Sequence, residues 1–263
     1  MLAIMSDHVT LRYAAASDRG LVRANNEDCL YAGSRLIAVA DGVGGQAAGE
    51  VASELAIAAL APLDDDGSGD PVAALRGAIE TANRYIRAAS ESDPALAGMA
   101  TTITALLLSG TSLALAHAGD SRAYLLRGGE VTQVTRDDTY VQGLVDQGCI
   151  SPEEAGTHPQ RSLVTRVLQG SSVEATYTRP DLMPGDRYLL CTDGLPDAVS
   201  PGAIAATLQG EADPEQCVAQ LIELALAGGG PDNVSVVVAD LVVESVDGPE
   251  DDDEPAAVPG SAR

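Results

Sequence analysis

Short apolar runs beside an aspartate recur along this chain. Residues 36–40 have the apolar, partly β-branched composition of a short buried strand, and Asp41 follows them at once. A glycine in the next position, Gly42, lets the main chain approach another group closely because it has no side chain. The other examples are Asp120 after residues 113–118, Asp193 after residues 188–192, and Asp232 before residues 234–238. Several strand ends that each present a carboxylate are what a site for a hard metal ion requires.

The hydrophobic periodicity predicts both strands and helices. Strands are predicted at residues 9–16, 29–32, 101–108, 112–118, 121–126, 130–135, 173–178, 187–192 and 233–242. Helices are predicted at residues 49–60, 71–90, 201–208 and 214–227, with helical turns that begin at Asp137 and Ser151. The strands between residues 101 and 135 follow one another after short turns, which favours antiparallel pairing because parallel strands need long crossovers. The predicted fold class is therefore α+β.

Composition and charge exclude several classes of function. The formal net charge of −24 disfavours nucleic acid or an anionic membrane as a partner. All 15 basic residues are arginine, so a P-loop, the strand lysine of a kinase and Schiff-base chemistry are excluded. No apolar run is long enough to span a membrane and the first residues lack a basic leader, so we expect a cytoplasmic protein without signal peptide or anchor.

Acidic residues and cysteines also suggest how the chain is organised. Residues 250–254 are all acidic, and we expect residues 244–263 to form a disordered acidic tail after one folded domain that spans residues 1–243. The cysteines are scattered and form no CxxC pair, so we expect reduced thiols rather than disulfides or a zinc site.

The acidic residues at the strand ends can be interpreted in two ways, as turn residues or as metal ligands. Taken alone, an Asp-Gly pair after a strand is more often a hairpin turn than a ligand. Several such carboxylates without nearby Cys or His favour Mg²⁺ or Mn²⁺. Two such ions about 3.5–4 Å apart can activate a bridging water and clamp a phosphoryl oxygen. The planar guanidinium of Arg23 can hold a phosphate with two hydrogen bonds, so no protein nucleophile is needed for phosphoryl transfer to water.

Six motifs occur in an order that resembles a known family. They are Arg23-x-x-Asn-Glu27-Asp28, the Asp41-Gly42-x-Gly44 segment, and residues 98–102 (GMATT), 119–122 (GDSR), 190–194 (LCTDG) and 230–233 (GPDN). Together they resemble the metal-dependent serine/threonine protein phosphatases, the PPM or type 2C family, over roughly residues 9–242. Residues 157–162 make the bacterial branch that opposes eukaryotic-like Ser/Thr kinases the most similar.

This resemblance implies the fold and the reaction. The family fold is a sandwich of two antiparallel β-sheets flanked by helices on both faces, in four layers α-β-β-α. The implied activity is that of a phosphatase in which metal-activated water attacks the phosphorus of phosphoserine or phosphothreonine in line. The implied partners are phosphoproteins, including Ser/Thr protein kinases and their substrates, and we expect a monomer.

The resemblance also implies a role for each site residue. Asp41 would bridge two Mn²⁺ or Mg²⁺ ions, and Arg23 would bind the substrate phosphate. The further roles are Gly42 (carbonyl ligand), Asp193 and Asp232 (first ion), Glu27 (second ion, directly or through water), Asp28 (through water or behind the ligands), and Asp120, Asp193 and the Ser162 backbone (a third ion).

One position departs from the family pattern. Many animal members have a histidine, proposed as the general acid, where this chain has Val43. Either a metal-bound water or another residue would then protonate the leaving group. His158 is a weak candidate because Thr-His-Pro is more often a turn, and His117, in an apolar run, is predicted to be a packed core residue.

Three alternatives remain open. The glycines after residues 36–40 also resemble a dinucleotide-binding turn, although no second strand ending in a ribose-binding acid follows. A non-catalytic phosphoprotein-binding regulator of the same fold is a second reading, but every expected acid is present. The third is a stress-response phosphatase acting on an anti-sigma-factor antagonist, a branch that often carries sensor domains.

Overall fold

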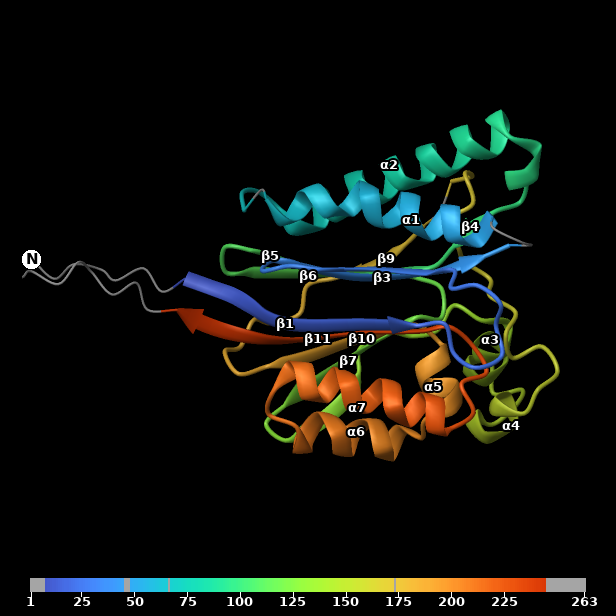
Figure 1. Cartoon of the computed structure of the whole chain (residues 1–263). Coiled ribbons are helices and arrows are strands. Elements are labelled where there is room, and N and C mark those ends of the chain that lie inside the picture. Colours follow the sequence, from blue (N-terminus) through green and yellow to red (C-terminus); the bar gives the residue numbers. More distant parts are fainter. Residues whose placement is uncertain (1–7, 45–47, 66, 173, 245–263) are drawn as a thin grey trace, which may run out of the picture.

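Two β-sheets pack face to face, and helices cover the outer face of each (Figure 1). The structure is a computed structural model that describes residues 8–44, 48–65, 67–172 and 174–244. The predicted α+β sandwich with layers α-β-β-α is confirmed. The tail expected at residues 244–263 lies outside the described residues, except for Glu244, which ends a strand.

Both sheets are antiparallel throughout. Sheet 1 has the strand order β1-β11-β10-β7-β8, with β1 (His8–Asp18), β7 (Arg122–Arg127), β8 (Glu130–Gln133), β10 (Arg187–Cys191) and β11 (Val234–Glu244). Sheet 2 has the order β2-β3-β5-β6-β9, with β2 (Asp28–Ala32), β3 (Leu36–Val43), β5 (Ile103–Ser109), β6 (Ser112–Ala118) and β9 (Thr176–Thr178). The short β4 (Ala100–Thr101) pairs with the end of β3. Because β3 has antiparallel neighbours, the dinucleotide-binding alternative is wrong.

Three of the helices that cover the sheets begin at a capping residue followed by proline. Helices α1 (Ala48–Leu60) and α2 (Pro71–Ser92) lie on sheet 2, and α5 (Gly194–Ala198), α6 (Pro201–Gly210) and α7 (Pro214–Ala227) lie on sheet 1. Asp70, Ser200 and Asp213 accept backbone N–H groups at the starts of α2, α6 and α7. Each is followed by a proline, which fits the first helical turn because its missing N–H is not needed there.

Buried apolar side chains fill the space between neighbouring layers. Leu36, Leu107 and the inner faces of α1 and α2 form one group, and Leu189 and Val236 pack with α6 and α7 in another. Between the sheets lie Ile37, Leu190 and their neighbours. The nearly continuous apolar runs of the central strands follow from this arrangement, because each central strand is buried on both faces.

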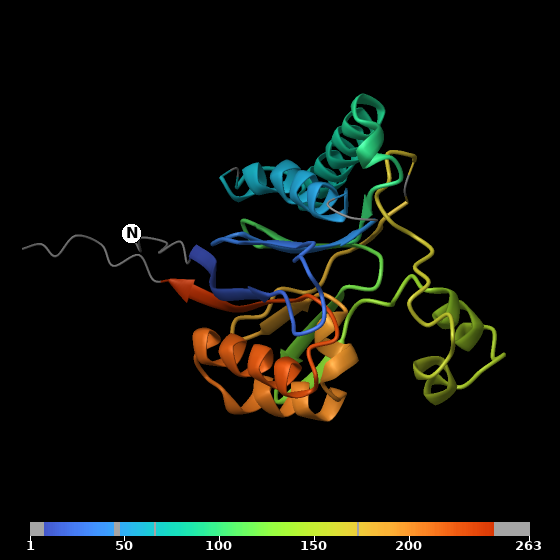
Figure 2. The same cartoon turned by 45° about the vertical axis from the view of Figure 1, so that its right-hand side comes forward.

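A smaller subdomain extends beyond one end of the sandwich (Figure 2). It contains α3 (Tyr140–Asp146) and α4 (Pro152–Gly156), and it lies at the end where β3 and β10 finish (Figure 1). The 3-10 turns η1 (Ala61–Asp64) and η2 (Pro94–Leu96) complete the elements. No helix within the described ranges is long and apolar enough to cross a membrane.

The sequence-based elements differ from the structure in a few places. The strand predicted at 101–108 is interrupted at Thr102, whose hydroxyl accepts the Asp41 N–H at 2.9 Å. Helix α5 and the turn η1 were not predicted, since both are too short to show a periodicity. The strand predicted at 173–178 is ordered as Thr176–Thr178, and residue 173 lies outside the described residues.

Candidate metal centre

The predicted site residues meet at the end of the sandwich that carries the α3–α4 subdomain. A cavity of about 580 Å³ is lined there by eight of the nine, drawn from both sheets and their connections. They are Arg23, Glu27, Asp41, Gly42, Asp120, Ser162, Asp193 and Asp232. Asp28, the ninth, does not line the cavity.

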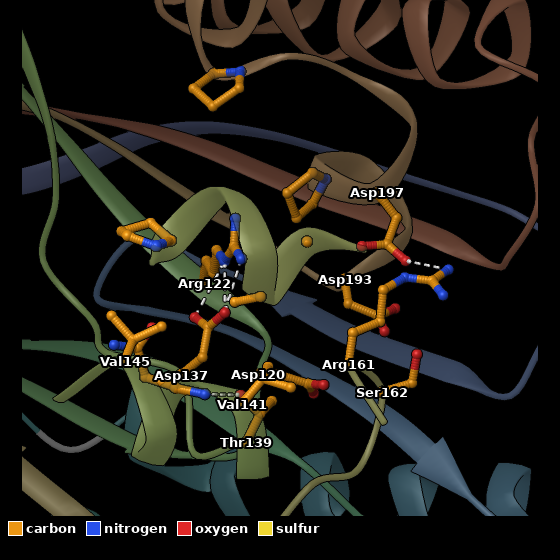
Figure 3. Close-up of a pocket in the computed structure, with 16 residues that line it drawn as sticks. Asp120, Arg122, Asp137, Thr139, Val141, Val145, Arg161, Ser162, Asp193 and Asp197 are labelled. Carbon is orange, nitrogen blue, oxygen red and sulfur yellow. Dashed lines mark hydrogen bonds and ion pairs between the residues drawn. The ribbon is translucent and has the colours of Figure 1, made fainter. Parts of the chain in front are cut away.

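A second cavity of about 640 Å³ adjoins the first and opens toward α3 and α4. Asp120, Ser162 and Asp193 line both cavities, so they stand where the two meet. Figure 3 shows these side chains beside Arg161 and Asp197, whose Nη2 and Oδ2 atoms are 3.9 Å apart. This ion pair joins the loop after α4 to α5.

Residues 101 and 102 hold the backbone of Asp41 in place. Its carbonyl oxygen accepts the Thr102 N–H and the Thr101 hydroxyl, each at 2.9 Å. The Thr102 hydroxyl lies 2.8 Å from the Ser121 hydroxyl, and Ser121 directly follows Asp120. These contacts fix the backbones that carry the two carboxylates.

The Asp-Gly pair at 41–42 is no turn. Strand β3 continues through Asp41 and Gly42 to Val43, and Gly42 pairs with Thr101 in β4. Glycine is required for close approach, because a Cβ on Gly42 would lie 2.3 Å from the Gly49 oxygen and 2.6 Å from the Glu27 oxygen. A Cβ on Gly49 would meet Glu27 Oε2 at 2.3 Å. The two glycines together make room for Glu27.

Asp28 lies behind the cavity, between the two sheets. Its Oδ2 accepts the Thr192 hydroxyl at 2.8 Å, and Thr192 in turn accepts the Ser235 N–H at 2.9 Å. Its other oxygen, Oδ1, is buried and has no hydrogen-bond partner in the described structure. Asp28 therefore ties β2 of sheet 2 to β10 and β11 of sheet 1 and keeps one oxygen free.

Asp193 precedes α5 but does not cap it. Its side chain makes no capping hydrogen bond, and its buried Oδ1 has no hydrogen-bond partner in the described structure. The next residue, Gly194, packs directly on the start of β11, since a Cβ there would lie 2.0 Å from the Asn233 oxygen. This close packing brings Asp193 and Asp232 to one cavity.

Asn233 organises the loop that carries Arg23 and Glu27, a role the sequence did not reveal. Its Nδ2 donates to the carbonyl oxygens of Arg19 at 2.9 Å and Asn25 at 2.8 Å. Its Oδ1 accepts the Glu27 N–H at 2.8 Å. One buried amide thus satisfies three backbone groups of a loop more than 200 residues away in sequence. The only signal in the sequence was its place in the GPDN motif.

Arg23 reaches into the cavity and pairs with Asp232. Its Nη2 donates to Asp232 Oδ2 at 2.6 Å, and about half of the Arg23 side chain remains exposed. Burial acts to lower the pKa of Arg23, but the hydrogen bond and the charge of Asp232 outweigh it and raise the pKa. The guanidinium therefore stays charged.

Burial and mutual repulsion raise the pKa values of several carboxyl groups in the cavity. Burial, followed by the charges of Asp193 and Asp28, raises the pKa of Asp41 well above its usual value. Burial and the charge of Asp193 raise the pKa of Asp120 to about 7. Burial and the charge of Asp232 raise the pKa of Asp193 to about 6. Proteins concentrate negative charge at this cost where a cation or a reaction uses it.

The donor set fits divalent ions that prefer oxygen. The carboxylates of Asp41, Asp120, Asp193 and Asp232 line one cavity, and buried oxygens of Asp28 and Asp193 have no hydrogen-bond partner. Within the described part of the chain, no three Cys, His, Asp or Glu side chains already gather as a ready-made ion site. Oxygen-only chemistry favours Mg²⁺ or Mn²⁺.

His117 and His158 do not line the cavity. His117 is buried, with Nδ1 2.9 Å from the Thr104 hydroxyl and Nε2 3.1 Å from the Arg136 oxygen, which confirms it as a packed core residue. Burial lowers its pKa. His158 accepts the Gln160 N–H at 3.1 Å in an exposed turn and lines neither cavity, which supports the interpretation as a turn.

Comparison with known proteins identifies the family of this chain. The sequence matches the protein phosphatase 2C family over residues 23–224, and the chain belongs to this family. It is 61% identical over 237 residues to the serine/threonine protein phosphatase PstP of Mycobacterium tuberculosis, a match that covers 89% of this chain and 46% of that protein. The chain thus spans less than half of the length of that relative.

Solved structures show the same architecture. The crystal structure of the M. tuberculosis phosphatase PstP/Ppp is 61% identical, with a TM-score of 0.86 over 89% of this chain and 99% of that one. A catalytic domain of PstP in complex with two manganese ions is 58% identical, with a TM-score of 0.85 and the same shares of the two chains covered.

Proposed function

We propose that this chain is a metal-dependent protein serine/threonine phosphatase. The observation that carries the proposal is the single cavity that holds Arg23 together with Asp41, Asp193 and Asp232. The chain belongs to the protein phosphatase 2C family, and the catalytic domain of PstP binds two manganese ions. An arginine beside clustered carboxylates suits a phosphate ester that is recognised between a guanidinium and divalent cations.

The residues divide into ion ligands and a phosphate ligand. Asp41 would bridge two Mn²⁺ or Mg²⁺ ions, with Gly42 as a carbonyl ligand, and Asp193 and Asp232 would hold the first ion. Glu27 would hold the second ion, directly or through water, and Asp28 would act through water or from behind the ligands. Asp120, Asp193 and the Ser162 backbone would hold a third ion. When bound, the ions would supply Lewis acidity to the phosphoryl oxygens and lower the pKa of a water molecule.

The protein side chains would bind and orient the substrate. Arg23 would donate hydrogen bonds to the phosphate, and its present contact with Asp232 keeps the guanidinium aimed into the cavity. Asn233 would hold the Arg23 loop in place through the backbone of Arg19, Asn25 and Glu27. Val43 cannot donate a proton, so the leaving alkoxide would take its proton from solvent or from another group.

The biological setting is part of the same proposal. The substrates would be phosphoserine and phosphothreonine proteins, including Ser/Thr kinases and their targets. Residues 1–243 would form the catalytic domain and residues 244–263 an acidic tail. We further propose that the domain acts as a monomer in the cytoplasm.

The decisive experiment measures hydrolysis of a phosphothreonine peptide by the whole chain with Mn²⁺, with Mg²⁺ and with EDTA. Metal-dependent release of phosphate that is lost in Asp41→Asn supports the proposal. Binding of phosphopeptide and Mn²⁺ without hydrolysis would instead favour a non-catalytic regulator of the same fold. A preference for a phosphorylated anti-sigma-factor antagonist over kinase substrates would place the activity in a stress-response pathway.

A further inference from the structure

Four large apolar side chains line the cavity that holds Arg23 and the carboxylates. They are Val43, Leu163, Val164 and Val167, and we refer to these residues as the apolar wall. Val43 is 43% exposed and Leu163 is 49% exposed. Apolar side chains that share a cavity with convergent polar groups are typical of a binding site rather than of ordinary surface composition.

The backbone beneath this wall is held in place. Leu163 accepts the Tyr140 N–H at 2.9 Å, and Val164 pairs with Thr139. Further along, Leu168 and Thr101 exchange hydrogen bonds at 2.9 and 3.0 Å. The segment at residues 163–168 is thus anchored both to the start of α3 and to β4. A fixed apolar surface loses little conformational entropy when a ligand binds to it.

The charges around the wall restrict what could occupy it. Six acidic residues line the same cavity, and its two arginines are already paired, Arg23 with Asp232 and Arg161 with Asp197. Among the described lining residues, no arginine is left unpaired for a second negative group, and the divalent ions would be taken up by the carboxylates and the phosphate itself. The whole chain also carries a net charge of −24. A phosphopeptide with acidic neighbours would be repelled, whereas one with apolar neighbours would bury them on the wall.

We propose that the apolar wall selects phosphopeptides that carry a large apolar side chain next to the phosphorylated residue. This inference rests on the proposed phosphatase function and names its substrate class. The phosphate would lie at Arg23, and the flanking side chain would pack on Val43 and Leu163. The wall acts on specificity and takes no part in the reaction itself.

The test compares phosphothreonine peptides that differ only at the two residues flanking the phosphothreonine. Leucine, serine, glutamate and lysine flanks are compared by kcat/KM with Mn²⁺, in wild type and in Val43→Thr/Leu163→Asn. Wild type should prefer the leucine over the serine peptide by about fivefold or more, which corresponds to partial burial of one leucine side chain. The glutamate peptide should be the poorest substrate.

The double variant should bring the leucine-to-serine ratio below about two. Met183→Ser, which removes an equally exposed apolar side chain that does not line the cavity, should leave the ratio unchanged. Circular dichroism checks that each variant is folded, and Val43→Thr alone provides the test if the double variant is not. Equal rates for leucine and serine peptides, a best rate for lysine flanks, or an unchanged ratio in the variants would overturn the proposal.

Hydrolysis of p-nitrophenyl phosphate, which has no flanking residues, distinguishes a failure of the apolar-wall proposal from a failure of the proposed phosphatase function. Turnover of this compound by wild type without any preference among the peptides overturns the apolar wall alone. Absence of metal-dependent turnover for it and for every peptide overturns the phosphatase function and the apolar wall with it.

Discussion

Asp28 and Asp41 lie directly opposite each other in the antiparallel pair of β2 and β3. Like charges in this relationship destabilise a sheet. Burial, followed by the charges of Asp193 and Asp232, raises the pKa of Asp28 to about 7, and burial also dominates the raised pKa of Asp41. The two facing carboxylates destabilise the folded state unless a proton or a cation neutralises their charge.

The first prediction concerns the pH dependence of stability in EDTA. The folded state holds protons on Asp28 up to a pKa of about 7, whereas the unfolded chain releases them near a pKa of about 3.9. The folded state binds more protons in this window, so the free energy of unfolding falls as the pH rises, by up to about 1.4 kcal/mol per pH unit for such a carboxyl. Urea unfolding from pH 4.5 to pH 8 measures this slope.

Asp28→Asn should make that slope shallower, because the amide has no proton to lose, while the raised pKa values of Asp120 and Asp193 keep part of the slope. Glu54→Gln, on the exposed side of α1, provides the matched control and should keep the wild-type slope. Addition of Mn²⁺ at pH 8 should raise the free energy of unfolding of wild type. A slope of the opposite sign in EDTA would contradict the buried carboxyl cluster.

The second prediction is a loss of activity when the central carboxylates are neutralised. Asp41→Asn and Asp193→Asn keep the size of the side chain but remove its charge, and kcat/KM with Mn²⁺ should fall by at least about 100-fold, since charge stabilisation by metal ions contributes several kcal/mol. Both variants should unfold at higher urea concentration than wild type in EDTA at pH 8. Retention of most activity in either one would count against the two-ion site.

The third prediction separates phosphate binding from the chemical step. Arg23→Ala should raise KM more than it lowers kcat, because the guanidinium binds the phosphate in both the ground state and the transition state. Arg23→Lys should recover only part of the loss, as an ammonium cannot make the two-pronged contact. Steady-state kinetics on a phosphothreonine peptide give both constants. An effect confined to kcat would refute this role.

The fourth prediction tests Asn233 as a positioning residue. In Asn233→Asp an oxygen replaces the Nδ2 that donates to Arg19 and Asn25, and the two partly buried carbonyl groups lose their donor. We expect a loss of about 2–4 kcal/mol in the free energy of unfolding, together with a higher KM from a displaced Arg23. Asn25→Asp makes the same chemical change at an exposed side chain on the same loop and should have little effect.

The fifth prediction concerns Tyr188, whose buried hydroxyl makes no hydrogen bond in the described structure. Tyr188→Phe removes an unsatisfied polar atom at constant shape, so the free energy of unfolding should stay unchanged or rise by up to about 1 kcal/mol. Leu190→Ala in the same layer should instead cost about 2–5 kcal/mol. Urea unfolding compares the two, and a large loss in Tyr188→Phe would reveal a partner for the hydroxyl.

Local pattern was enough to predict most elements and the acidic strand ends. The apolar run before Asp41 and the cap at Asp70 are encoded within a few residues, and both appear in the structure as expected. The order of the motifs then led to the family, and through it to the sandwich. These features are predictable because neighbours in sequence determine them.

Relationships between distant segments could not be predicted in this way. The contact of Thr192 with Asp28 and the packing of Gly194 on Asn233 join residues that only the folded sheets bring together. The continuation of β3 beyond Asp41 depends on its pairing with β4, and a strand of two residues is too short to be recognised in the sequence. The sequence could predict candidate ligands but not the residues that hold them in place.

Because residues from both sheets line the cavity, the cavity can form only after the two sheets have formed and packed together. Asp41 belongs to sheet 2, whereas Asp193 and Asp232 flank strands of sheet 1. Strand β11 is the last strand in the described part of the chain, and it pairs along its whole length with β1, the first described strand. A nascent chain therefore cannot complete the cavity before Asp232 and β11 have been synthesised. In refolding experiments the recovery of activity should follow the slow closure of this long loop, well after helices α1 and α2 have formed.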